Sequence, residues 1–293
     1  PGSAPNGSGR RGGLAFAALG VTAFSLTFPA TAKALDGFGP WTVTLARTVL
    51  AALIAACCLA AARVPPPRRH HWPGLALVAV GCVLGFPLLT TLALRTSDTA
   101  HVAVVTGLLP LTTAIYAAAR TGSRPPPLFW AAATAGAAAV AAFTVADSGG
   151  ALAGGDLYLF AALLLCAAGY GEGGRLAGLL PGWQVISWAL IACLPLAAPG
   201  LALALLAEPA APTAASVAGL AWLAAGSGFF GLLVWYRGLA QAGVARASQI
   251  QLAQPLLTLV WAVALLGEEL SPAAPATTAA VLVCIAVTQR ARR

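Results

Sequence analysis

Long apolar runs follow one another along almost the whole chain, separated by short breaks rich in charged residues, proline or glycine. Most runs have close to the roughly 20 apolar residues that a helix needs to cross a lipid bilayer. The pattern therefore predicts ten transmembrane helices. Their expected positions are Leu14 to Ala32, Trp41 to Ala62, Trp72 to Leu94, Thr99 to Ala119, Leu128 to Ala146, Gly155 to Gly173, Trp183 to Leu206, Ala215 to Tyr236, Val244 to Leu266 and Pro272 to Thr288.

Composition supports this interpretation. Hydrophobic residues make up 59% of the chain, charged residues only 8%, and the mean hydropathy is +0.86. Soluble domains have about 25% charged residues, so we expect an all-α integral membrane protein. Residues 1–12 are small, polar and basic, and we expect them to form a disordered tail in which Pro1 to Ser3 are an expression scar.

Basic residues gather at one end of the predicted helices. Because Lys and Arg in short loops stay on the cytoplasmic side of a membrane, the loops that hold most of them define that side. Both termini are then expected in the cytoplasm, and the net charge of +8 reflects topology rather than a nucleic-acid partner. The cytoplasmic side receives thirteen of the sixteen basic residues: Arg10, Arg11, Arg63, Arg68, Arg69, Arg120, Arg124, Arg175, Arg237, Arg246, Arg290, Arg292 and Arg293.

Acidic residues divide the other way. Glu172 is expected inside, and every acidic residue lies in a loop or at a helix end, so no carboxylate is available at the midplane to carry a proton or hold sodium. The outer side is expected to hold Asp36, Asp98, Asp147, Asp156, Glu208, Glu268 and Glu269.

Cysteine and histidine give no sign of a metal or cofactor. The six cysteines fall within apolar runs without metal-ligand spacing, so they are interpreted as small packing residues. His70 and His71 are expected to be solvated in a cytoplasmic loop. His101, near the outer end of the fourth helix, is a group able to titrate or to hydrogen-bond a substrate.

An internal repeat relates the two halves of the chain. Five helices per half is an odd number, so the second half enters the membrane from the opposite side. We therefore expect two inverted five-helix repeats, residues 13–147 and 155–289, around a central cavity, an architecture typical of transporters. A shift of 145 residues matches Leu94 with Leu239, Ala100 with Ala245, Pro110 with Pro255, Leu111 with Leu256, Thr113 with Thr258 and Tyr116 with Trp261.

Polar side chains and a proline interrupt the ninth run, and the fourth run repeats the arrangement. At about 100° per residue, the polar residues of the ninth helix fall on one arc of roughly 140°. Since a polar group facing lipid costs free energy, both arcs are expected to face protein or water. The arcs hold Ser248, Gln251, Gln254, Pro255, Thr258 and Trp261 in the ninth helix, and Thr106, Pro110, Thr113 and Tyr116 in the fourth.

Two interpretations of these arcs remain open. Ser, Thr and Gln often join neighbouring membrane helices, at about 0.6 kcal/mol for each hydrogen bond. The arc stands beside a proline in both halves, however, and a proline kinks a helix and frees carbonyl groups for a ligand. We therefore expect the arcs to line a substrate site. The first and third helices add polar or kinking residues at Thr22, Ser25, Pro29, Pro87, Thr90 and Thr91.

The segment GLAQAGVARASQIQLAQPLLTLVWAVALLGEELSP, from Gly238 to Pro272, resembles the signature of the drug/metabolite transporter superfamily, EamA type. The first half carries a weaker copy that lacks the Leu-Gly-Glu ending. The resemblance extends from Gly13 to Thr288 and includes Pro40 and Arg47. The matching features are the small residues Ala245 to Ser248, interrupted by Arg246, then Pro255-Leu256 and Leu266-Gly267-Glu268, with Pro110-Leu111 in the first half.

This resemblance implies a ten-helix protein of the bacterial inner membrane that exports small metabolites and needs no cofactor. Members of the family include amino-acid exporters of the YddG type, which handle aromatic amino acids. Beyond the bilayer and a small-molecule substrate no partner is implied, and a monomer suffices. A ring-bearing zwitterion would meet the aromatic residues Tyr116, Tyr170, Phe230 and Trp261 and the neutral polar residues Thr106, Ser227, Gln251 and Gln254.

Transport is expected to run down the substrate gradient, or to couple weakly to an ion, by rocking one half against the other. Arg47, within the second helix, either pairs with a substrate carboxylate or faces backbone carbonyls. Catalysis is not expected, because Ser227 in Gly-Ser-Gly has no intramembrane histidine to serve it. The alternatives are export of another metabolite or drug, and a channel-like pore, for which the sequence shows no charged ring or carbonyl filter.

Overall fold

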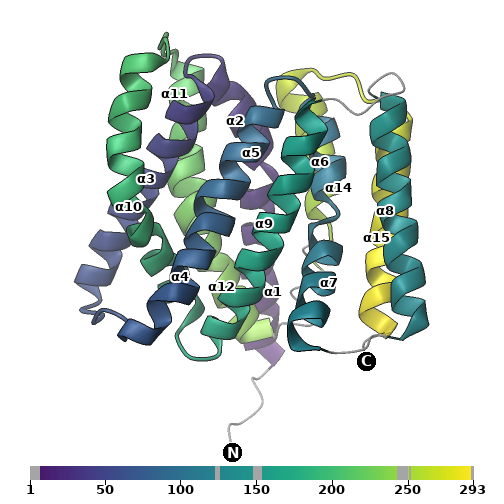
Figure 1. The fold of residues 1–293 in the computed structure, drawn as a ribbon, viewed down its shortest axis with the longest axis horizontal. Helices are drawn as coiled ribbons and strands as arrows, with labels where there is room; N and C mark the ends of the chain where they lie inside the picture. The colour runs from purple at the N-terminus through teal and green to yellow at the C-terminus, as the bar shows by residue number, and fades with distance from the viewer. Residues whose placement is uncertain (1–6, 123–125, 148–153, 243–249, 251, 292–293) are drawn as a thin grey trace, which may run out of the picture.

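The structure is a computed structural model and describes residues 7–122, 126–147, 154–242, 250 and 252–291. Every regular element in these ranges is a helix. The helices run roughly side by side between two faces, and α1 begins and α15 ends at the same face (Figure 1). We call this face the terminal face and the other the opposite face.

The first half of the chain contains several helices that follow one another with little or no break. A single turn residue, Leu26, separates α1 from α2, and Gly107 and Leu108 separate α6 from α7. The elements are α1 (Gly7–Ser25), α2 (Thr27–Leu35), α3 (Pro40–Ala61), the 3-10 helix η1 (Arg69–His71), α4 (Trp72–Val78), the π-helical η2 (Ala79–Gly85), α5 (Phe86–Ala93), α6 (Thr99–Thr106), α7 (Leu109–Thr121) and α8 (Pro127–Asp147).

The second half has the same character. A π-helical segment joins α11 to α12, and another extends α14. The elements are α9 (Gly154–Ala177), α10 (Gly182–Ala207), α11 (Ala214–Ala221), η3 (Trp222–Phe230), α12 (Gly231–Ala242), α14 (Gln254–Trp261), η4 (Ala262–Leu266) and α15 (Ala273–Ala291).

Eight helical runs among the described residues are long and apolar enough to cross a membrane, and they match the first eight predicted segments to within a few residues. Two shorter apolar runs, Gln254–Leu266 and Ala273–Val287, stand where the ninth and tenth were predicted. The start of the predicted ninth helix falls on residues 244–249 and 251, outside the described residues.

Large apolar side chains cover much of the outside of the bundle. Leu196, Leu203 and Leu206 of α10 are 71%, 68% and 86% exposed. Exposed apolar surface on this scale suits contact with lipid tails rather than water. The chain is a multi-pass membrane protein.

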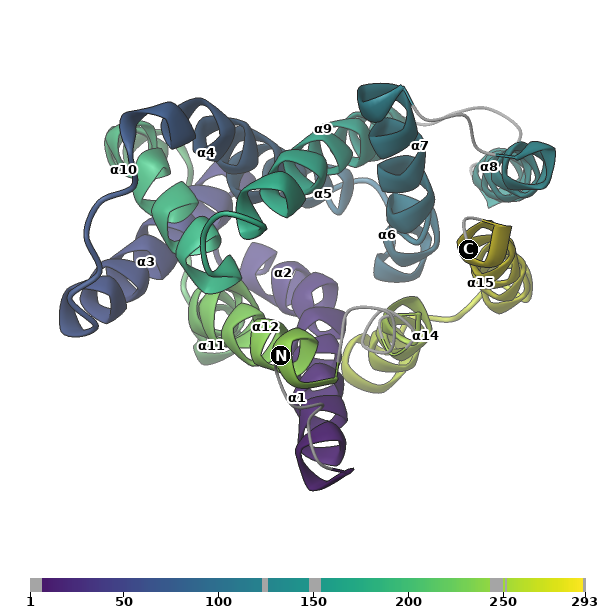
Figure 2. The ribbon, with the colours of Figure 1, turned by 90° about the horizontal axis from the view of Figure 1, so that it is seen from below.

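Small residues allow the helices to approach closely inside the bundle. A Cβ added to Gly238 of α12 would lie 2.5 Å from the backbone nitrogen of Ala17 of α1, and one added to Gly81 of η2 would lie 2.4 Å from the Leu165 carbonyl oxygen of α9. Such contacts explain how α1 packs along α12 and η2 along α9 (Figure 2).

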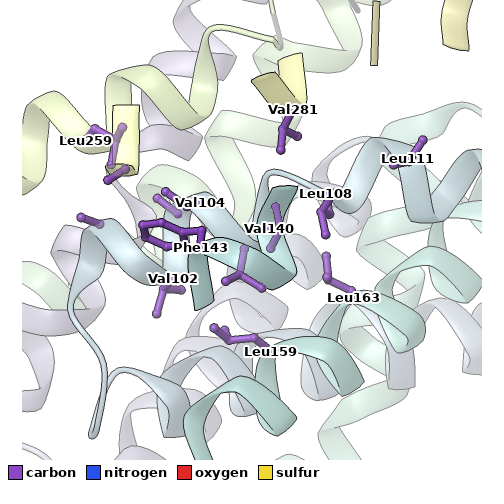
Figure 3. Close-up of a cluster of buried hydrophobic side chains, with 14 of the residues drawn as sticks. Val102, Val104, Leu108, Leu111, Val140, Phe143, Leu159, Leu163, Leu259 and Val281 are labelled. Carbon is purple, nitrogen blue, oxygen red and sulfur yellow. The ribbon is translucent and has the colours of Figure 1, made fainter. Parts of the chain in front are cut away.

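One apolar cluster joins helices that are far apart in the sequence. Val102 and Val104 of α6, Phe143 of α8, Leu159 of α9 and Leu259 of α14 all belong to it, and all are buried (Figure 3). The cluster fixes α6 between elements from both halves. The helix that carries Thr106, the first residue of the first-half polar arc, is therefore held on several sides.

The four prolines that were expected to kink helices occupy a common position. Pro87, Pro110 and Pro255 stand in the first turn of α5, α7 and α14, and Pro29 is the third residue of α2. Pro29 and Pro110 follow a break in the helix, and Pro87 follows the π-helical segment η2. The residues before Pro255 are only partly described. Pro29, Pro87 and Pro110 each lie inside one continuous helical run, Gly12–Leu35, Arg69–Ala93 and Thr99–Arg120 respectively. Kinks in such runs occur at prolines and π-helical segments, and the kinking role of these residues stays a prediction.

Candidate functional site

Residues from both halves meet where the end of α1 lies against the second half of α14. The indole Nε1 of Trp261 donates to the Ser25 hydroxyl over 2.9 Å, and the Thr258 hydroxyl lies 3.0 Å from the Ser25 carbonyl oxygen. Ser25 and Thr258 are buried, and Trp261 is partly buried. Three residues that the sequence predicted for the site, separated by more than 230 positions, thus form one polar contact, which we call the α1–α14 contact.

The contact lies beside interrupted backbone. Ser25 is the last residue of α1, directly before the break at Leu26. Nearby, α14 packs against α6, and a Cβ added to Gly107, in the break between α6 and α7, would lie 3.8 Å from the Cγ of Pro255. The breaks in the first and fourth predicted helices therefore both lie against α14, and breaks of this kind are where transporters expose backbone groups to a ligand.

The π-helical segment η3 holds two further predicted site residues. Ser227 is 5% exposed, and its hydroxyl has no hydrogen-bond partner in the described part of the chain. Phe230 is 52% exposed, with its ring 5.6 Å from that of Phe229. Because π-helical turns and unsatisfied buried hydroxyls are both concentrated at functional sites, the Ser227 hydroxyl is a candidate to form a hydrogen bond with a ligand.

The hydroxyl groups of the predicted threonines donate hydrogen bonds to backbone carbonyls one turn earlier in their own helices. A hydroxyl that donates to its own helix keeps its oxygen lone pairs as acceptors, so each could still accept a bond from a ligand ammonium. Thr90 and Thr106 are buried, and Thr22 and Thr113 are half-buried. The bonds run from Thr22 to the Ala18 carbonyl (2.9 Å), Thr90 to Phe86 (2.8 Å), Thr91 to Pro87 (2.6 Å), Thr106 to Val102 (2.6 Å) and Thr113 to Leu109 (2.8 Å).

The remaining predicted residues lie farther apart. Tyr116 of α7 is half-buried against α9, where a Cβ on Gly171 would come within 2.6 Å of its ring. Tyr170 is 47% exposed on α9. Gln254 begins α14 and is half-buried, Gln251 lies outside the described residues, and Arg47 is half-buried in α3.

Two carboxylates cap helices of the other half, which sequence reasoning missed. Glu208, after α10, accepts from the backbone N–H groups of Trp41 and Thr42 at 3.1 and 2.8 Å, at the start of α3. Glu268 accepts from Thr99 and Ala100 at 2.9 and 3.0 Å, at the start of α6. A helix N-terminus attracts negative charge and has free N–H groups, so both carboxylates tie second-half residues to first-half helices.

A buried ion-pairing contact was also missed. The Nε2 of His101 lies 2.7 Å from the Oδ1 of Asp156, and their side chains are 5% and 0% exposed. Asp156 was predicted at the outer end of a helix; it stands in the first turn of α9, where it is completely enclosed. His71, expected to be solvated, is likewise buried, with 8% exposure. The contact joins two separate helices, α6 and α9. The periodicity of a single helix does not show which residue of another helix it will meet.

Interrupted apolar helices, whose polar side chains meet between the two halves of the chain, define a multi-pass membrane protein of the transporter class. The chain belongs to the EamA-like transporter family, whose model matches it twice, over residues 11–145 and 153–289. The predicted membership of the drug/metabolite transporter superfamily, EamA type, is confirmed.

Relatives agree with this assignment. The chain is 41% identical, over 275 residues, to the "Uncharacterized transporter YdeK" of Bacillus subtilis (strain 168), covering 93% of this chain and 95% of that protein. A solved structure described only as "Crystal structure of protein" has a similar fold, with a TM-score of 0.66 and 20% identity. That similarity covers 94% of this chain and 98% of the other.

Proposed function

We propose that this transporter exports amino acids with aromatic or other apolar side chains. Membership of the EamA-like family supports transport as the activity. Exposed aromatic rings at Tyr170 and Phe230, the partly buried Trp261, and neutral hydroxyl acceptors in α1, α5 and α6 suit a zwitterion with a ring or apolar side chain. Among the described residues, no three metal-ligating side chains gather that could hold a metal ion, and the proposal requires none.

The proposed architecture is ten transmembrane helices in two inverted repeats, residues 13–147 and 155–289. The double match of the family model to nearly the same ranges supports the duplication. The basic residues of the terminal face support cytoplasmic termini in a bacterial inner membrane. A monomer is sufficient for this scheme, and neither a nucleic-acid nor a protein partner is needed.

The α1–α14 contact is the observation that carries the proposal. It joins the end of α1, an interrupted helix in the first half, to the middle and end of α14 in the second half. A carrier that rocks one half against the other must make and break such contacts while a substrate site between them changes its access. A polar substrate group competes for the same Ser25 and Thr258 oxygens.

The proposal is tested with purified protein in liposomes preloaded with radiolabelled phenylalanine, tryptophan, leucine or glutamate. We expect saturable efflux of the apolar and aromatic amino acids and little efflux of glutamate. Ser227→Ala and Gln254→Ala should lower efflux about tenfold or more, the effect of losing one good hydrogen bond to a charged group. Thr134→Ala, which removes an exposed threonine of α8 that bonds only its own helix, is the matched control and should transport normally.

Other outcomes are equally informative. Wild-type efflux from both variants would assign Ser227 and Gln254 to helix packing and contradict the proposed site. Flux that rises linearly with concentration would indicate the channel-like alternative. No efflux of any amino acid would contradict the substrate class and favour another metabolite or a drug.

A further inference from the structure

A groove opens at the terminal face between two connections of the chain. Its volume is about 730 Å³. One wall is the connection from α3 to α4, and the other is the connection from α9 to α10 (Figure 1). We call it the basic groove, and it is lined by Ala62, Arg63, Val64, Pro65, Pro66, Pro67, Arg68, His70, His71, Leu179, Leu180 and Gln184.

The polar lining of the basic groove is cationic or neutral. Arg63, Arg68, His70 and His71 contribute to it, and none of its described lining residues is acidic. Arg63 and Arg68 take part in none of the ion pairs found among the described residues, and the Glu172 carboxylate, against α4, is bound by Arg175 instead. Two guanidinium groups close to one concave surface favour an anion that can accept several hydrogen bonds.

His71 adds an independent sign of a missing partner. The residue is 8% exposed, and its Nδ1 is buried with no hydrogen bond in the described structure. Its ring lies 4.0 Å from that of His70, measured between centroids. Buried polar atoms are nearly always hydrogen-bonded, so an orphan beside a groove indicates a group that binds there.

The backbone holds Arg63 in an unusual conformation. Its φ is 52°, in the left-handed region that favours glycine, and it is the single non-glycine residue of this kind in the described chain. Bonds from Arg63 N to the Ala60 carbonyl and from Val64 N to the Leu59 carbonyl, both 3.0 Å, close the end of α3. Glycine would fit this position without the steric cost, so arginine stands there at the expense of stability, as residues at functional sites often do.

The position of the groove relative to the membrane indicates which molecule supplies the anion. Trp72, the residue after the lining residue His71 at the start of α4, contacts Trp188 of α10 edge to face, with centroids 6.2 Å apart. Tryptophan prefers the boundary between lipid headgroups and tails, so the groove lies level with the headgroups of the leaflet at the terminal face. Leu179 and Leu180 add apolar surface for the acyl chains of a lipid.

We propose that the basic groove is a binding site for a phosphate group, supplied by the headgroup of an anionic phospholipid. Arg63 and Arg68 hold the phosphate oxygens, and His71 completes the hydrogen bonds. The site is separate from the α1–α14 contact and does not depend on which substrate is transported. It would fix the α3–α4 and α9–α10 connections to the leaflet.

The test uses the full chain in a neutral detergent and follows its thermal unfolding midpoint. Phosphatidylglycerol, phosphatidylcholine and inorganic phosphate are added separately. We expect phosphatidylglycerol, and not phosphatidylcholine, to raise the midpoint with saturation. Arg63→Gly, which removes the charge and relieves the backbone, and Arg68→Gln should each weaken half-saturation about tenfold. Arg120→Gln changes an exposed arginine outside the groove and should respond as wild type does.

Native mass spectrometry provides a readout that does not depend on stability, by counting retained phosphatidylglycerol molecules. A response to inorganic phosphate equal to that of the lipid, and lost in Arg63→Gly and Arg68→Gln, supports the site with free phosphate as its occupant. The proposal is overturned if wild type responds to neither probe, or if both groove variants bind phosphatidylglycerol as Arg120→Gln does.

Discussion

Single residues set the geometry at the end of the Leu-Gly-Glu motif. Gly267 has a φ of 70°, and a Cβ added to it would have no atom within 4 Å. Glycine is therefore required by the backbone conformation and not by a lack of space. The reversal ends η4 and directs Glu268 to the first N–H groups of α6. The sequence signature thus corresponds to a turn followed by a helix cap.

Gly267→Ala is predicted to lower stability by about 1 kcal/mol, the usual cost of a left-handed conformation for a residue with a Cβ. Gly174→Ala is the matched control, because that glycine also has open space around it but an ordinary helical conformation in α9. The control should be neutral or slightly stabilising. Thermal unfolding in detergent measures both, and equal midpoints for the two variants would contradict the conformational explanation.

At the scale of elements, polar contacts fix which helices stay together at the opposite face. His101 and Asp156 join α6 to α9, while Glu268 joins the end of η4 to the start of α6. Helix α6 is thereby held by a carboxylate contact on two sides, in addition to its apolar cluster. Pairing of this kind cannot be read from periodicity, since one helical pattern is compatible with many neighbours.

Asp156→Ala is predicted to destabilise the protein by about 3–5 kcal/mol, because removing one member of a buried pair leaves its partner enclosed without it. The double variant His101→Phe, Asp156→Leu removes both polar groups and should recover most of that loss. Chemical or thermal unfolding of the two variants checks the difference. A single variant as stable as wild type would show that His101 and Asp156 do not depend on each other.

At the scale of the whole molecule, the length of the apolar runs predicted the all-helical membrane fold and the positions of eight spans. The first eight spans, the transporter class and the family followed from runs of apolar residues and from the Pro-Leu and Leu-Gly-Glu motifs. The ninth-helix arc also selected Thr258 and Trp261, and the polar residues of the first helix included Ser25, which the fold brings to both of them. The Glu208 cap, the His101–Asp156 pair and the buried His71 required the tertiary structure, because each depends on an approach between separate segments.

The two halves, produced as separate chains of residues 1–147 and 148–293, are predicted to associate when expressed together. The caps and the α1–α14 contact supply bonds across the division that neither half has alone. Co-purification through a tag on one half measures association. Glu208→Gln combined with Glu268→Gln should reduce the yield of the pair, whereas an undiminished yield would assign association to apolar packing.

The caps also have a consequence for biosynthesis. Trp41 and Thr99 precede the carboxylates that bind them by 167 and 169 residues. At about 5–20 residues per second, a ribosome needs roughly 10 to 30 seconds to reach Glu208 after α3 has begun, and about as long to reach Glu268 after α6. During that interval water or the insertion machinery must accept hydrogen bonds from the exposed N–H groups at the starts of α3 and α6. Maturation of the earliest helices is therefore timed by the last part of the chain to be translated.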